Sequence, residues 1–204
     1  MLSFWKSPVL ALAFVMMVAC NSAPSEPAGE ARIRVLLTDA PSDYIASAEV
    51  EITRVYLQGG GAEEGDDAGR VDLFNDPDNP RVYDLLTLRD GVTADLTGAV
   101  TVEPGQYGQL RMVVGQATVT LIDGFSFRDG ETSKALFVPS GAQSGIKIQL
   151  VQDVTVSPGD LTTIIVDFDV DQNFVLQGNP ETPAGIHGIL FTPVLREKSR
   201  ETSG

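Results

Sequence analysis

The chain has 204 residues and a formal net charge of −14 at pH 7, with 28 acidic and 14 basic side chains, one cysteine and one histidine. This charge and the lack of Lys/Arg clusters exclude a nucleic-acid-binding protein, because a phosphate backbone requires clustered cations. The single cysteine excludes an intramolecular disulfide, and the single histidine excludes metal sites built from several histidines.

Residues 1–19 have the layout of a secretory signal peptide. Lys6 supplies a positive charge, and residues 8–19 form an apolar stretch too short to cross a bilayer as a stable helix. The sequence MVAC at 17–20 resembles the lipobox of bacterial lipoproteins, in which cleavage precedes the cysteine and its thiol carries a diacylglycerol. Met17 replaces the leucine usual there. We therefore expect lipidation of Cys20; an ordinary signal peptide ending near a cysteine is the alternative.

Lipidation at Cys20 would hold the protein in the cell envelope through acyl chains, palmitate among them, buried in a membrane leaflet. Asn21 follows the cysteine. The resemblance therefore implies the outer membrane if the host is Gram-negative, because aspartate at this position is the usual inner-membrane signal. Residues 20–31 are rich in Ser, Pro, Ala and Glu, which predicts a disordered tether.

Residues 32–196 alternate short runs of Val, Ile, Thr, Leu and Tyr with Gly, Pro, Asn and Asp. About nine or ten strands with frequent turns predict one antiparallel β-sandwich domain, of Ig-like or prealbumin-like type. The polar residues 197–204 predict a flexible tail. The expected strands span 32–38, 48–57, 82–88, 99–102, 109–114, 117–122, 134–138, 145–156, 162–170 and 188–195.

One sequence pattern occurs twice, as VTVEPGQY at 100–107 and VTVSPGDL at 154–161. Proline followed by glycine suits a type II turn, because proline fixes φ at the second position and glycine accepts a positive φ at the third. We expect two hairpins in analogous places, which is compatible with a duplication and does not require one.

Asp167, Asp169 and Asp171 alternate with Phe168 and Val170. On a strand, this alternation would place the three carboxylates on one face and the apolar side chains on the core face. Same-face residues lie about 6.8 Å apart, so one Ca²⁺, with ligand distances of about 2.4 Å, could join two of them but not all three.

Such a calcium site would need further oxygens from a loop, and Asp39 or the acidic residues 63–67 are candidates. A row of solvated carboxylates is the alternative. Apart from calcium, the sequence predicts no cofactor.

No motif predicts an enzyme. His187 has no nucleophile beside it, and neither a Gly-x-Ser-x-Gly elbow nor a phosphate-binding loop occurs. The segment PSGAQSG at 139–145 instead offers uncharged donors and acceptors, so Ser140, Gln143 and Ser144 are candidate contacts for a sugar or peptide. A purely structural loop, with Gly141 and Gly145 needed for tight geometry, is the alternative.

Ordered blocks along the chain resemble the uncharacterised bacterial domain of unknown function 4382. This resemblance implies an exported, often lipidated, β-sandwich-like domain, and it implies no reaction and no site residues. The blocks are VLLTDAPSD at 35–43, VEITRV at 50–55, DLLTL at 84–88, PGQYGQLR at 104–111, VPSGAQSGIK at 138–147, DFDV at 167–170 and PVLR at 193–196.

The function expected first is a non-catalytic cell-envelope lipoprotein that binds or scaffolds a protein, peptide or glycan at the membrane surface. The second is a calcium-stabilised adhesion or carbohydrate-binding module. The third is an envelope hydrolase with paired carboxylates, for which no pair is marked in the sequence.

Overall fold

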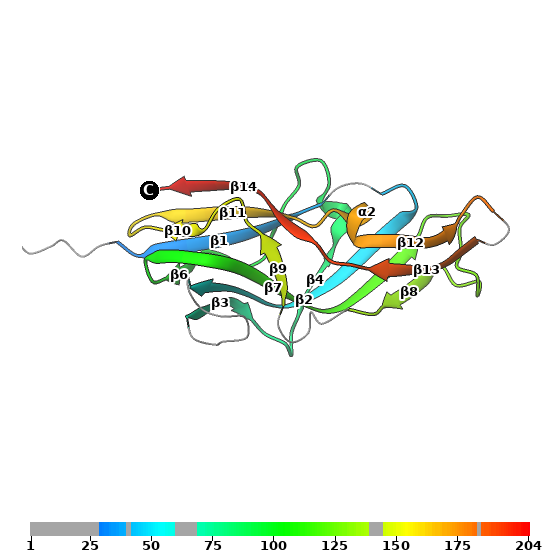
Figure 1. The fold of residues 1–204 in the computed structure, drawn as a ribbon, viewed down its shortest axis with the longest axis horizontal. Helices are drawn as coiled ribbons and strands as arrows, with labels where there is room; N and C mark the ends of the chain where they lie inside the picture. Colours follow the sequence, from blue (N-terminus) through cyan, green and yellow to red (C-terminus); the bar gives the residue numbers. More distant parts are fainter. Residues whose placement is uncertain (1–28, 40–41, 60–68, 139–144, 183–184) are drawn as a thin grey trace, which may run out of the picture.

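A computed structural model describes residues 29–39, 42–59, 69–138, 145–182 and 185–204, and their regular secondary structure is almost all β-strand (Figure 1). The predicted all-β class is confirmed. Among these residues, no helix has the length and apolar character needed to cross a membrane. The elements are β1 Ala31–Thr38, β2 Ile45–Gly59, β3 Arg70–Asn75, β4 Arg81–Asp84, the 3₁₀-helix η1 Leu85–Leu88, β5 Ala94–Asp95, β6 Val100–Val102, β7 Gly105–Leu121, β8 Ser133–Leu136, β9 Ile146–Gln149, β10 Val154–Val156, β11 Leu161–Asp167, α2 Val170–Asn173, β12 Phe174–Asn179, β13 Gly185–Phe191 and β14 Leu195–Ser203.

Twelve strands form one mixed sheet, and β12 and β13 form a separate two-stranded sheet, here called the ribbon. The main path runs β3-β2-β7-β9-β14-β11-β1-β5, with β4 beside β2, β6 beside β1, and both β8 and β10 beside β7. Because β1 pairs with β11 in parallel, and β14 with β9 in parallel, the prediction of a purely antiparallel fold is wrong. Side-chain alternation shows which face is buried but does not give the direction of the neighbouring strand.

Alternating side chains place one face of the sheet in a common apolar core. On β1, Ile33, Val35 and Leu37 are fully buried, and on β11 Ile164 and Val166 are as well. The long strands β2 and β7 pair along most of their length, with register shifts at several points. Such irregularities bend a strand and increase its twist, which lets these two strands curl around the core.

The ribbon lies at one end of the molecule, where it forms a second, smaller apolar cluster with the end of β7. Leu176 of β12 and Ile186 of β13 pack with Leu121 at the end of β7. The chain enters the fold at the other end, where the grey trace meets β1 in Figure 1. The entry point and the ribbon therefore lie at opposite ends of an elongated molecule.

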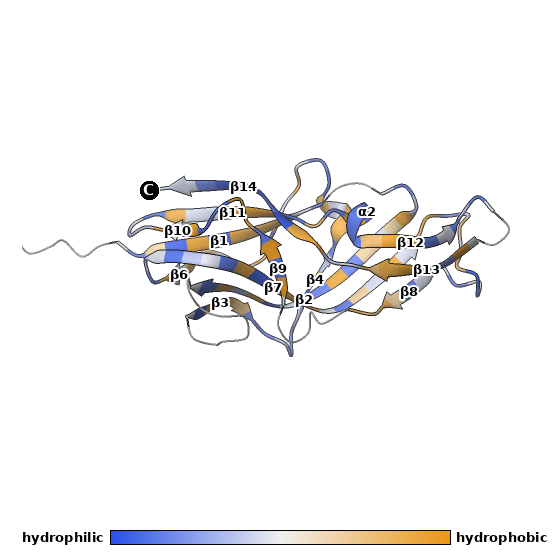
Figure 2. Ribbon diagram, viewed as in Figure 1, coloured by the Kyte–Doolittle hydropathy of each residue, from blue (hydrophilic) through white to orange (hydrophobic). Residues whose placement is uncertain are grey.

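The prediction of a flexible tail over 197–204 is wrong, because residues up to Ser203 belong to β14. This strand pairs with β11 along its whole length, from Asp167 opposite Arg196 to Leu161 opposite Ser203. Only Leu195 of β14 is buried, and Figure 2 shows the second half of the strand in blue and near-white, without hydrophobic colours. This segment is held in place by backbone pairing with β11, and the hydropathy of its side chains gives no sign of that pairing.

The boundary at the predicted tether also shifts. Ala31 is buried in β1, and the carbonyl of Gly29 accepts a hydrogen bond from Gly159 N at 3.0 Å. Residues 29–31 therefore belong to the folded domain, while the signal peptide, Cys20 and residues 21–28 lie outside the described residues.

The two Pro-Gly segments are corners rather than hairpins. β6 pairs with β1, β7 pairs with β10, and each corner thus joins strands with different partners. The second corner has the predicted turn chemistry: Gly159 has φ 86°, and Asp160 N donates to Ser157 O at 3.2 Å. At the first corner Gly105 has no positive φ and already begins β7, so the type II turn predicted there is wrong.

Candidate functional site

The aspartates predicted as metal ligands lie where β11 ends. The strand stops at Asp167, whereas the sequence predicts a strand to residue 170. Asp169 has φ 33° and caps α2, its carboxylate accepting from Gln172 N at 3.2 Å and from the Gln172 side-chain amide. Asp171 is exposed in the first turn of α2. The three carboxylates therefore do not line one face of a strand, and that part of the prediction is wrong.

Asp39 and Asp167 lie near each other in the parallel pair β1–β11, since Thr38 is opposite Asp167. Asp39 is buried, and its Oδ1 accepts from Val170 N at 2.9 Å, which ties the end of β1 to α2. Asp167 Oδ1 lies 3.7 Å from Lys198 Nζ. Within the described ranges, no group of three or more His, Cys, Asp or Glu side chains is placed to hold a metal ion. The contacts of Asp167 and Asp169 do not favour the predicted calcium site, which stays an untested hypothesis; residues 63–67, the other donors predicted for it, lie outside the described residues.

Asn173, which sequence reasoning did not identify, holds the ribbon to the rest of the domain. Its side chain is fully buried. The amide nitrogen donates to the carbonyls of Phe168, Asp169 and Val194, and the amide oxygen accepts from Val194 N. Both the nitrogen and the oxygen of this buried amide are hydrogen-bonded to the backbone, so we assign Asn173 a structural role.

Three phenylalanines reinforce the same junction. Phe168 follows β11, Phe174 begins β12 and Phe191 ends β13, and all three are buried. The ring centroids of Phe174 and Phe191 are 4.8 Å apart, and each lies 6.2 Å from that of Phe168. The inner face of the ribbon is thus fixed to the core by aromatic packing.

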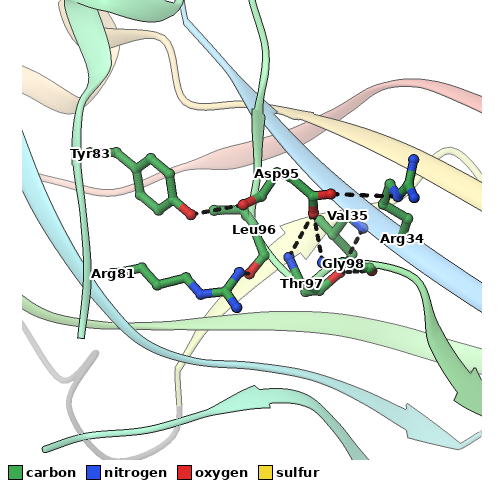
Figure 3. A network of polar contacts seen from close by, with 8 residues as sticks. All are labelled: Arg34, Val35, Arg81, Tyr83, Asp95, Leu96, Thr97 and Gly98. Carbon is green, nitrogen blue, oxygen red and sulfur yellow. Dashed lines mark hydrogen bonds and ion pairs between the residues drawn. The ribbon is translucent and has the colours of Figure 1, made fainter. Parts of the chain in front are cut away.

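A polar network joins β4 to β5 (Figure 3). The Arg81 guanidinium donates to Leu96 O, and the Tyr83 hydroxyl donates to Asp95 O at 2.9 Å. β4 pairs with β2 and β5 pairs with β1, so these side chains connect strands from the two sides of the curled sheet. Burial raises the pKa of Tyr83, against the opposing effect of the nearby Arg81 guanidinium.

We call this junction between β4 and β5 the seam. On its β5 side, residues 95–98 form a turn held by several hydrogen bonds. Asp95 Oδ1 accepts from Thr97 N at 3.1 Å and Gly98 N at 2.7 Å, and Asp95 Oδ2 lies 3.5 Å from Arg34 Nε. Thr97 Oγ1 accepts from Val35 N at 3.0 Å. Because β4 and β5 do not pair through their backbones, these side-chain hydrogen bonds hold the two strands together, and we assign the network in Figure 3 a structural role.

The outer face of the ribbon exposes an apolar cross-strand pair. Val175 of β12 and Leu190 of β13 are directly opposite each other, with relative exposures of 44% and 48%. Val194, which is hydrogen-bonded to Asn173 at the base of the ribbon, is 39% exposed. We call the cross-strand pair of Val175 and Leu190 the ribbon face. Sequence alternation could have indicated it, but β12 was not among the predicted strands.

The predicted ligand-contact residues Ser140, Gln143 and Ser144 lie outside the described residues, as does Cys20. The chain re-enters the described structure at Gly145, which has φ 69°. A Cβ at this position would lie 3.2 Å from Met112 O, so both conformation and space require glycine here. This agrees with the structural alternative for Gly145 and does not test ligand contact.

The fold and these contacts define an all-β domain in which a curled mixed sheet carries a ribbon with an exposed apolar face. The chain belongs to the family described as Domain of unknown function (DUF4382), whose model matches residues 30–183. The match confirms the predicted family, and it ends before β13 and β14. Neither a curated protein nor a solved structure matches the chain significantly.

Proposed function

We propose that the protein is a non-catalytic binding domain of the cell envelope, anchored to a membrane by lipid on Cys20, which presents the ribbon face to a protein, peptide or glycan. The observation that carries this proposal is the exposed cross-strand pair of Val175 and Leu190. Large apolar side chains that adjoin on a surface, in contrast to single ones, are typical of interaction sites.

The position of the ribbon supports the proposal. The chain enters at the end of the molecule opposite to the ribbon (Figure 1). With Cys20 in a membrane, the ribbon would lie at the end of the domain farthest from the attachment point, where it can reach other envelope components.

We also propose that the ribbon and the strands beneath it correspond to the two layers of an Ig-like or prealbumin-like sandwich.

The roles of the carboxylates favour binding over catalysis. Asp39, Asp95 and Asp169 each accept a backbone N–H that closes a turn or begins a helix. Carboxylates engaged in this way stabilise local structure, whereas a glycosidase requires two carboxyl groups facing each other across a cleft.

Site-specific photo-crosslinking in the native host tests the binding proposal. A photoreactive amino acid at Leu190 should give a discrete adduct with an envelope component. The matched control is Val151, which is 81% exposed and lies between β9 and β10, away from the ribbon. No adduct from Leu190, or the same adducts from both positions, would contradict the proposed binding face.

The anchor is tested separately by fractionating cells that express the Cys20→Ala variant. We expect the wild-type chain in the membrane fraction, the outer membrane in a Gram-negative host, and the variant outside it, because lipid chains supply the attachment. Equal membrane retention of both proteins would overturn lipid anchoring and leave the crosslinking result unaffected.

A further inference from the structure

The edge strands of the molecule differ in how they are protected against pairing with another chain. Natural sheets place charged side chains on exposed edges to prevent such pairing. Among the described edge strands of four or more residues, β3, β4 and β8 carry charges, whereas the two ribbon strands carry no Asp, Glu, Lys or Arg. The charges are Arg70 and Asp72 on β3, Arg81 and Asp84 on β4, and Lys134 on β8.

The two edges of the ribbon are not equivalent. At the outer edge of β13, Arg128 N donates to Ile186 O at 2.8 Å, and Phe127 forms a parallel bridge with Ile186. For β12, the described chain shows no backbone hydrogen bond to residues 175–178 other than the ladder with β13. The outer edge of β12 is therefore open to an added strand over residues 175–178, whereas the outer edge of β13 is closed at Ile186.

Charge around β12 restricts what such a strand can be. Exposed carboxylates flank the strand, Asp171 just before it and Glu181 just after it. In an antiparallel pair of two copies, the Asp171 end of one would meet the Glu181 end of the other, and both carry the charge of −14. Like charges placed opposite each other disfavour pairing, so self-association through β12 is opposed.

We propose that the outer edge of β12 accepts a strand from a partner protein: an extended, uncharged segment with alternating apolar side chains, flanked by Lys or Arg. Six residues of β12 extend over about 20 Å, and apolar side chains of the added strand would continue the ribbon face beside Val175. Its flanking cations would lie near Asp171 and Glu181. This inference rests on the proposed binding function and specifies its ligand class.

The test uses the full-length lipoprotein in detergent and a fluorescent peptide, Lys-Lys-Val-Thr-Val-Thr-Val-Thr-Lys-Lys. Control peptides carry Glu in place of every Lys, or Pro in place of the central Val. We expect the Lys-flanked peptide to bind and to slow amide exchange in 174–179, measured by mass spectrometry. The Glu-flanked peptide should bind at least about tenfold more weakly, and the Pro peptide should not protect β12.

Protein variants separate the two parts of the inference. Val175→Lys should weaken binding at least about tenfold, whereas the control Val151→Lys should leave it unchanged. Asp171→Asn with Glu181→Gln should weaken binding about fivefold at low salt, and this difference should shrink as salt is added. Unchanged melting temperatures establish that each variant is folded.

Binding without protection of β12, or equal affinities for Val175→Lys and wild type, would overturn the proposal. So would a concentration-dependent dimer protected at 174–179, since the occupant would then be a second copy. If the Leu190 crosslinker captures an envelope component while no peptide protects β12, the binding function stands and this inference fails. If the peptide binds β12 but the crosslinker at Leu190 gives no adduct, the proposal that the ribbon face contacts an envelope component is overturned instead.

Discussion

The body of the molecule and its ribbon differ in the side chains that their exposed strands carry. In the body, meaning the twelve-stranded sheet, edge strands such as β3 and β8 carry charged side chains. At the junction of β4 and β5, Arg81 and Tyr83 donate hydrogen bonds to the carbonyls of Leu96 and Asp95. The ribbon carries no such charges and exposes Val175 and Leu190. In one chain, then, some strand edges carry charges or side-chain hydrogen bonds that oppose pairing, and the ribbon strands lack them, which is why we propose the ribbon as the surface for a partner.

The largest expected loss of stability comes from a substitution that weakens the attachment of the ribbon to the rest of the domain. Phe191→Ala removes one ring from the stack with Phe168 and Phe174, and we expect a loss of about 3–5 kcal/mol in the free energy of unfolding, measured with urea. The control Leu190→Ala, on the exposed face next to it, should change stability by less than about 0.5 kcal/mol. Equal losses would mean that the two faces of the ribbon are not distinct.

The next effect concerns the buried amide at the same junction. Asn173→Ala leaves Val194 N and the carbonyls of Phe168 and Asp169 without this partner, so we expect a loss of about 2–4 kcal/mol. Asp171→Ala, an exposed change in the same short helix, serves as the control. If the two variants melt alike in a calorimeter, the junction does not depend on the Asn173 hydrogen bonds.

A smaller effect tests the seam. Tyr83→Phe removes the hydrogen bond to Asp95 O and should cost about 0.5–1 kcal/mol near pH 7. Because burial raises the pKa of Tyr83, the folded protein binds its proton more tightly than the unfolded chain does. The resulting stability is complete below the ordinary tyrosine pKa of about 10 and declines as pH rises above it.

Urea midpoints measured between about pH 8 and 11 check this dependence. Tyr83→Phe should lose stability less steeply with pH than the wild type. It should still decline somewhat, because burial, and then the Glu103 carboxylate, also raise the pKa of Tyr107. Identical alkaline slopes in variant and wild type would show that the pKa of Tyr83 does not differ between the folded and unfolded states.

The smallest expected effect is that of calcium. Asp169 is engaged by Gln172, and Asp167 lies beside Lys198. We therefore expect the same melting temperature in millimolar calcium and in chelator. A rise of several degrees would show that the native state binds the ion, and would return Asp39 and Asp167 to consideration as ligands.

The sequence allowed the family, the all-β class and most strand positions to be predicted, because alternation of apolar side chains is a local signal. β1 was expected at 32–38 and spans Ala31–Thr38. The same signal could not show that β1 and β11 run parallel, because that depends on the route of the chain between them.

Two other segments show where local patterns mislead. Alternation in DFDVD predicts a strand, but Asp169 begins a short helix whose capping hydrogen bonds and buried Asn173 outweigh the pattern. β14 lacks an apolar pattern because only Leu195 is buried, and it is ordered through backbone pairing with β11. The ribbon face became evident only when the register placed Val175 opposite Leu190.

The most direct test of the ribbon as the binding surface places a photoreactive amino acid at Gln177, which is exposed on β12, in two backgrounds in the native host. One background is wild type, and the other carries Val175→Lys and Leu190→Lys. The account predicts an adduct with an envelope component in the wild type and its loss in the double variant, with equal membrane content and equal melting temperature. An adduct that persists unchanged in the folded double variant would contradict the account.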